Sequence, residues 1–79
     1  MAFAETEREW AERVARHLKA ELKRADVTYE ELAQRLKDYG FDETTASITN
    51  KLSRATLSAH FFLASLAAIG QYGLRVEDI

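Results

Sequence analysis

Apolar residues recur at helical spacing along most of the chain. In the first stretch, Trp10, Val14, Leu18 and Leu22 follow one another every four residues, which places them on one side of a helix over residues 6–24. The sequence holds no proline, and it is rich in Ala, Leu, Glu, Lys and Arg, the residue types that favour helix. The pattern therefore predicts helices throughout.

A second, shorter helix is predicted to begin after Thr28 and to end at Gly40. Thr28 and Glu31 have the spacing of a capping box, in which each side chain bonds the free backbone amide of the other residue. Gly40 suits the left-handed backbone that commonly follows a helix. The side chains that this helix is expected to turn inward are Leu32, Ala33, Leu36 and Tyr39.

The third predicted helix covers residues 44–54, with Asp42 or Thr44 as its cap, and it is polar. Its expected inward residues are Ala46, Ile48, Leu52 and Ala55, and its expected outward residues are Thr45, Thr49 and Asn50. β-Branched threonine is a poor choice for the surface of a helix. A run of such residues suggests a function, although packing in the folded chain also tolerates weak helix formers.

The fourth predicted helix, from the Ser58 cap to Gly70, is the most apolar part of the sequence. Its large side chains are Phe61, Phe62, Leu63, Leu66 and Ile69. They occupy more than one side of a helix, so this helix is expected to lie centrally or to contact a second subunit. The tail over residues 71–79 alternates apolar and charged residues like a short strand, which either pairs with its own copy across a two-fold axis or lies over the core.

These elements predict an all-α fold in one domain over residues 1–79. We expect a compact bundle of four to five helices with its core over residues 6–70 and a short extended C-terminal tail over residues 71–79. A chain of 79 residues buries only about 60–65% of the surface that its unfolded form exposes. Its core is marginal unless it is well packed or extended by a partner, which favours a homodimer.

Composition narrows the class of protein. The absence of cysteine rules out a disulfide framework and a thiolate metal site, and 47% apolar with 30% charged residues is typical of a globular protein. No apolar run approaches the roughly 20 residues that span a bilayer. The first residues lack the basic and apolar regions of a signal peptide. We therefore expect a cytoplasmic protein that does not contact membranes.

The charge is small and unevenly distributed. A net charge of −2 argues against a generally basic nucleic-acid-binding protein. Residues 27–43 hold five acids and two bases, whereas residues 44–79 hold three bases and two acids. No acid lies between Thr44 and Val76, so Lys51 and Arg54 of the third helix have no competing carboxylate within that segment. Two cations make a thin patch, and an incidental gap between acids explains it equally well.

No catalytic or metal-binding pattern is present in the sequence. His17 and His60 are far apart, and neither has Asp, Glu or Cys at a metal-ligand spacing. His17 is expected at the boundary of the core and His60 is expected to be buried at its edge. The three glycines lie at predicted helix ends or in the tail and form no phosphate-binding loop. We expect no enzyme activity, no cofactor, no metal and no small-molecule substrate.

A short helix, a connection and a polar second helix form the pattern of a helix-turn-helix, whose second helix enters the DNA major groove. The candidate DNA-binding residues are Thr45, Thr49, Asn50, Lys51 and Arg54. Asn50 offers the donor and acceptor pair that adenine requires, and Arg54 suits guanine or a phosphate. Lys19, Lys23 and Arg24 of the first helix are candidates for contacts to the DNA backbone. Because one copy carries few cations, we expect a homodimer that reads two half-sites.

A protein-interaction module that kept this architecture without binding DNA is the alternative. The acidic total charge and the broad apolar surface of the fourth helix favour it. A fold alone does not imply a function, and both uses of this architecture are possible.

The segment from Thr28 to Gly70 resembles the helix-turn-helix domains of phage Cro and CI repressors. The matching pieces are Thr28-Tyr29-Glu30-Glu31-Leu32-Ala33, Ser47-Ile48-Thr49-Asn50-Lys51-Leu52-Ser53-Arg54-Ala55 and Leu66-Ala67-Ala68-Ile69-Gly70. The resemblance implies a lambda-repressor-like fold and DNA binding of the transcription-regulator type. The chain departs from that pattern in two places. Its spacing from Ala33 to Ile48 is several residues longer, and Ala55 stands where a glycine usually ends the recognition helix.

Nearly the whole chain, from Trp10 to about Leu74, is similar to a small bacterial family catalogued as domain of unknown function 6471. The motifs that carry this similarity are Val27-Thr28-Tyr29-Glu30-Glu31-Leu32-Ala33, Asn50-Lys51-Leu52-Ser53-Arg54, Phe61-Phe62-Leu63 and Ala68-Ile69-Gly70. The similarity supports the domain limits and implies no activity.

Overall fold

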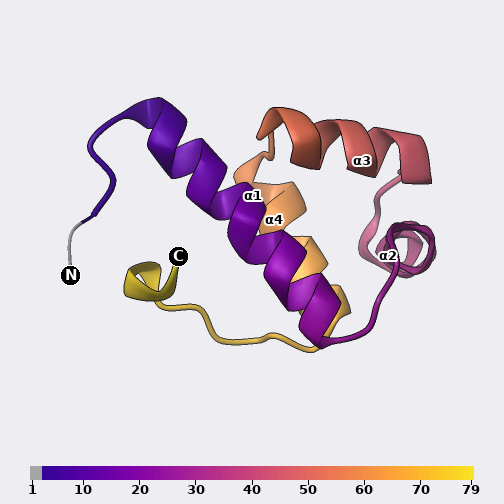
Figure 1. Cartoon of the computed structure of the whole chain (residues 1–79). Helices are drawn as coiled ribbons and strands as arrows, with labels where there is room; N and C mark the ends of the chain where they lie inside the picture. Colours follow the sequence, from indigo (N-terminus) through magenta and orange to yellow (C-terminus); the bar gives the residue numbers. More distant parts are fainter. Residues whose placement is uncertain (1–2) are drawn as a thin grey trace.

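The structure, a computed structural model, describes residues 3–79. Its elements in chain order are α1 (Glu7–Arg24), α2 (Tyr29–Leu36), the 3-10 helix η1 (Lys37–Tyr39), α3 (Thr45–Arg54), α4 (Ala59–Ala68) and the 3-10 turn η2 (Val76–Asp78). Over these residues the fold is all-helical, as predicted. In Figure 1, α1 crosses in front of α4, while α2, seen end-on, and α3 lie together on the right.

Three of the helices have an N-terminal cap with a single side-chain hydrogen bond. Thr6, Thr28 and Ser58 each accept a hydrogen bond from the backbone amide three residues further on. At Thr28 this bond comes from Glu31 at 3.1 Å, which is one half of the capping box predicted there. The caps place the helix starts within one residue of the predicted positions.

The complete capping box lies at the start of α3. The Ser47 amide donates to Thr44 Oγ1 at 3.0 Å, and the Thr44 amide donates to Ser47 Oγ at 2.9 Å. Thr44, and not Asp42, is therefore the cap of this helix. At its other end, Ala55 adopts a left-handed conformation with φ of 55°, the conformation in which a glycine is common.

The second helix ends differently from the prediction. Its α-helical part stops at Leu36, η1 continues it for one tight turn, and Gly40 then takes a left-handed conformation with φ of 88°. The prediction that Tyr39 points inward is wrong, because the tighter 3-10 turn rotates it to the surface and leaves it 47% exposed. η1 and residues 40–44 account for the long spacing between α2 and α3.

The core lies where all four α-helices meet. Its buried apolar residues are Ala15, Leu18, Leu22, Val27, Leu32, Ala33, Leu36, Ile48, Leu52, Phe61, Phe62 and Leu66. Three of the four inward positions predicted for α2 are among them, and α4 contributes Phe61, Phe62 and Leu66. Trp10 is the exception on α1: it is 37% exposed and stacks on Phe3, with 6.0 Å between ring centroids.

The fourth helix is central within a single copy of the chain. Its buried residues pack against α1 and α2, and Leu63 is its large apolar residue left mostly exposed. The broad apolar surface predicted for α4 is therefore largely covered by the chain itself. Exposed apolar side chains gather instead near the two ends of the described chain, at Phe3, Trp10, Tyr72, Leu74 and Val76.

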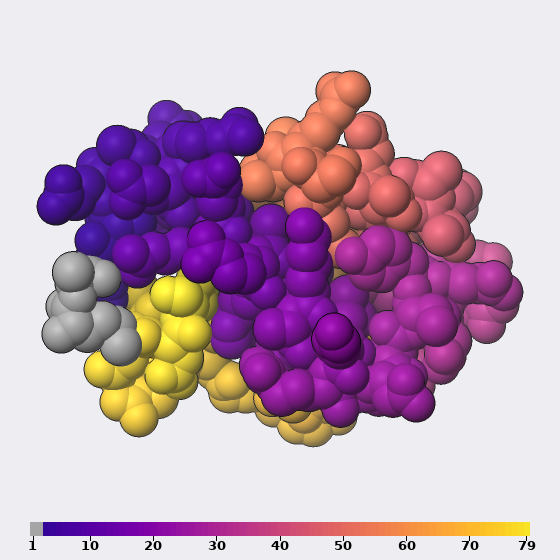
Figure 2. Space-filling view, viewed as in Figure 1, coloured from indigo at the N-terminus to yellow at the C-terminus, as the bar shows by residue number. Residues whose placement is uncertain are grey.

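The C-terminal tail lies over the core and forms no strand within residues 71–79. It runs back along α1 in an extended course, ends in η2, and places Ile79 against the core (Figure 1). In Figure 2 the yellow end of the tail covers the lower flank of α1. Within the described chain, no helix is long and apolar enough to cross a membrane.

Candidate nucleic-acid interface

The outer face of α3 is an uncharged, shallowly concave surface of small side chains. It is lined by Ala46, Ser47, Thr49, Asn50 and Ser53. Thr45, Thr49 and Asn50 are exposed, as predicted. This surface, which we call the α3 face, carries no acid and no base.

Ala46 belongs to this face and not to the core, so the prediction that it points inward is wrong. Ile48 and Leu52 are the buried residues of α3, and they define its inner side. Ala46 precedes Ile48 by two residues, which is a rotation of about 200° around a helix. Its small apolar side chain matched the core in type, but its position on the helix places it opposite the core.

The hydroxyl groups of Thr49 and Ser53 donate hydrogen bonds to the backbone of α3, whereas the side-chain amide of Asn50 has no partner in the described chain. Thr49 Oγ1 donates to the Thr45 carbonyl at 2.8 Å, and Ser53 Oγ donates to the Asn50 carbonyl at 3.2 Å. The Asn50 side chain has no hydrogen-bond partner within residues 3–79. Asn50 is therefore the group on the α3 face whose full set of hydrogen bonds remains available to a ligand.

Lys51 makes contacts within the domain, although its place in an acid-free stretch of the sequence suggested that it has no acidic partner. Its Nζ forms an ion pair with Glu43 and lies 4.6 Å from the centroid of the Phe61 ring. Glu43 lies just before the segment without acids, and Ser47 Oγ donates to its other carboxylate oxygen at 2.6 Å. Burial of the Glu43 carboxylate opposes its ionisation, but the hydrogen bonds from Lys51 and Ser47 and the charge of Lys51 outweigh burial and lower its pKa.

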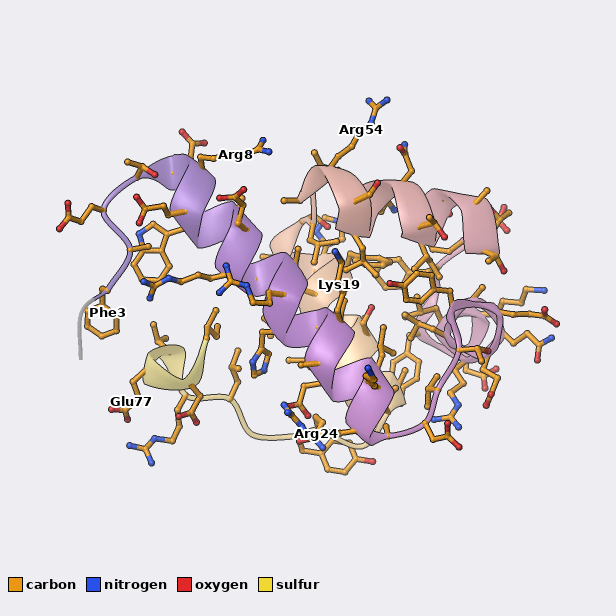
Figure 3. The ribbon with its side chains drawn as sticks, viewed as in Figure 1. Phe3, Arg8, Lys19, Arg24, Arg54 and Glu77 are labelled. Carbon is orange, nitrogen blue, oxygen red and sulfur yellow. The ribbon has the colours of Figure 1, made fainter. Side chains whose placement is uncertain are left out.

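Arg54 is exposed at the end of α3 and has no ion pair within the described residues. Figure 3 shows its side chain extending from α3 into solvent, at the same edge of the molecule as Arg8 of α1. Arg54 is thus a cation that remains available beside the α3 face.

The cations predicted for DNA backbone contacts on α1 divide into two groups. Lys19 lines a groove between α1 and α3, together with Arg16, which is not among the residues predicted from the sequence. Arg24 is at the far end of α1 and is ion-paired with Glu21. The signal that could have found Arg16 is its spacing of three residues from Lys19, which places both on one side of the helix.

The two histidines make ring contacts with the core. His17 is half-buried and meets Phe62 edge-on at 6.1 Å, as expected for a residue at the core boundary. His60 is exposed and stacks on Phe41 at 6.1 Å, so the prediction that it is buried is wrong. In the part of the chain that is described, no three His, Asp or Glu side chains are grouped so that they could hold a metal ion.

The fold and this surface define a small all-helical domain whose third helix presents a polar, uncharged face beside free cations. Residues 10–74 match the family described as domain of unknown function (DUF6471), and the chain belongs to that family. No curated protein and no solved structure matches the chain significantly.

Proposed function

We propose that the domain binds duplex DNA by placing the α3 face in the major groove, as part of a transcription regulator. The observation that carries this proposal is the exposed face of short, uncharged side chains with one free amide and a free arginine at its end. Such a face lets a helix approach base edges closely without repelling the phosphates. The helix-turn-helix relationship of α2 and α3 to the Cro and CI repressors is part of the same proposal.

Each candidate residue has a distinct role in this proposal. Asn50 pairs with adenine, Arg54 bonds guanine or a phosphate, and Thr45 and Thr49 allow close approach and contact the groove wall. We assign Lys51 a positioning role, because its ion pair with Glu43 ties α3 to the connection that precedes it. The hydrogen bonds to DNA then depend on Asn50 and Arg54, whose side chains are free.

The test is selection of the purified domain on a random duplex library, followed by affinity measurements on the enriched sequence. We expect the double variant Asn50→Ala with Arg54→Ala to lose at least tenfold in affinity, because one bidentate base contact is worth about 1–3 kcal/mol. The variant Gln34→Ala, exposed on α2, is the control. Unchanged affinity in a folded double variant would refute the assignment of the site.

A homodimer is the second part of the proposal. One copy presents few free cations, and binding to two half-sites doubles the phosphate contacts. The exposed apolar residues near the ends of the described chain, Phe3, Trp10, Tyr72, Leu74 and Val76, are candidates for the contact between copies. Sedimentation of the free domain at tens of micromolar measures this directly, and a monomeric mass would remove the support for it.

The alternative function is that of a protein-interaction module. The net charge of −2 and the same exposed apolar residues favour this reading. If it holds, a pull-down recovers one stoichiometric partner and the domain binds no duplex even at low salt. Enrichment of a palindromic sequence from the library excludes it as the main activity.

A further inference from the structure

A groove with unpaired cations separates α1 from the C-terminal end of α3. α1 contributes Arg8, Glu12, Arg16 and Lys19 to its lining, and α3 contributes Ser53. Ser53 and Ala55 both line the groove, and Arg54 lies between them in the sequence. Figure 3 shows Arg8 reaching from α1 toward α3 and Lys19 further along the same helix, while Arg54 extends from α3 into solvent.

Most of the positive charge of this groove is not neutralised by the chain. Arg8 forms an ion pair with Glu12 at 3.5 Å, the one acid in the lining. Arg16, Lys19 and Arg54 are exposed and have no ion pair among residues 3–79. A domain with a net charge of −2 thus has two free cations in this groove and a third beside it.

The groove continues into the α3 face. Ser53 lines both surfaces, so the cations begin where the uncharged face ends. A helix with its side chains is about 10–12 Å across and fills a major groove about 12 Å wide. Groups on a neighbouring helix then meet the phosphates at the edge of the groove, which is where Arg16 and Lys19 lie relative to α3.

The two ends of α3 differ sharply in charge. Asp42 is exposed just before the N-terminal end, and no free cation is described in residues 40–50. The C-terminal end carries Arg54 and lies against the α1 cations. DNA phosphates are therefore attracted to the C-terminal end of α3. In the usual recognition helix, the N-terminal end is the one that lies closest to the DNA.

We propose that the α1–α3 groove seats a phosphodiester of the DNA backbone, held by Arg16, Lys19 and Arg54. The C-terminal half of α3, with Asn50 and Ser53, then lies closest to the DNA. This assignment rests on the proposed function, because it places the phosphate beside a helix that lies in the major groove.

The experiment compares two double variants that change the net charge equally. Arg16→Gln with Lys19→Gln removes two groove cations, whereas Lys37→Gln with Arg75→Gln removes two exposed cations that do not line the groove. Affinity for the library-selected duplex is measured between 50 and 300 mM salt, and circular dichroism checks that each variant is folded. The single variant Asn50→Ala is measured in parallel.

We expect the groove variant to bind about tenfold or more weakly at 100 mM salt and to flatten the salt slope by about 1.8 for each bound copy. The control variant should retain the wild-type slope. Equal effects of the two double variants would overturn the groove assignment, since net charge alone would then explain the loss.

The failure of the groove and the failure of the proposed function give different results. Weak, flat-sloped binding by the groove variant with no effect of Asn50→Ala supports the phosphate site but contradicts base reading by α3. A loss with Asn50→Ala and none with the groove variant overturns the phosphate site and leaves the proposed function standing. No duplex binding by the wild type at 50 mM salt overturns both.

Discussion

The end of α3 depends on one residue in an uncommon backbone conformation. Ala55 has φ of 55° and ψ of 46°, where its Cβ crowds the neighbouring carbonyl at a cost of about 1–2 kcal/mol. We expect Ala55→Gly to raise the free energy of unfolding by about 0.5–1 kcal/mol, because glycine removes this strain and the lost methyl group is only half-buried. Urea denaturation followed by circular dichroism measures it.

Ala46→Gly is the matched control on the same helix. Ala46 is exposed and lies within α3, so glycine there adds flexibility without relieving strain and should lower stability by about 0.5–1 kcal/mol. If both variants lose stability to the same extent, Ala55 does not hold the left-handed conformation.

One ion pair attaches α3 to the connection before it. Glu43 accepts from Lys51 and from Ser47, and these contacts lower the pKa of its carboxyl group below its ordinary value of 4.5. Because the folded-state pKa is lower than that of the unfolded chain, the stabilisation is complete above the ordinary pKa. It is lost as the pH falls through the lowered folded-state value.

We therefore expect Glu43→Gln to destabilise the domain by about 1 kcal/mol at pH 7, since the pair is partly exposed. The variant should also lose less of its remaining stability than the wild type between pH 6 and pH 3. Thermal unfolding at several pH values measures both effects. Parallel curves for variant and wild type would show that this carboxylate does not contribute to the acid sensitivity.

The elements that local chemistry determines were predictable from the sequence. Thr28 and Ser58 cap their helices because a hydroxyl at that position reaches an amide three residues away, whatever the rest of the fold does. Leu18, Leu22 and Leu36 are buried because helical spacing alone places them on the inner side.

The role of Lys51 was not predictable, because it depends on contacts between elements. Its partners are Glu43, eight residues earlier, and the ring of Phe61 on α4. Charge counts along the sequence place Lys51 in an acid-free stretch and cannot show that the connection folds back onto α3. The groove cation Arg16 was hidden for the same reason, since its importance comes from the packing of α1 beside α3.

The distribution of charge over the domain limits how it can approach DNA. The acids of residues 27–43 lie along α2, η1 and the connection that follows. In contrast, the free cations Arg16 and Lys19 line the groove between α1 and α3, and Arg54 lies beside it. An acidic domain that binds DNA must turn its cationic side toward the phosphates. The charge distribution therefore sets the orientation of the domain on the DNA before any base is contacted.

The number of copies on the DNA follows from the same three cations. Each phosphate contact contributes about −0.9 to the slope of log affinity against log salt, so one copy should give a slope of about −2.7 and two copies about −5.4. We expect the steeper slope on a palindromic duplex and the shallower one on an isolated half-site, with a dimeric mass for the free domain at tens of micromolar. A shallow slope on both duplexes with a monomeric mass would instead mean that one copy binds alone. The affinity would then rest on base contacts by α3, and Asn50→Ala would weaken binding more than Arg16→Gln with Lys19→Gln does.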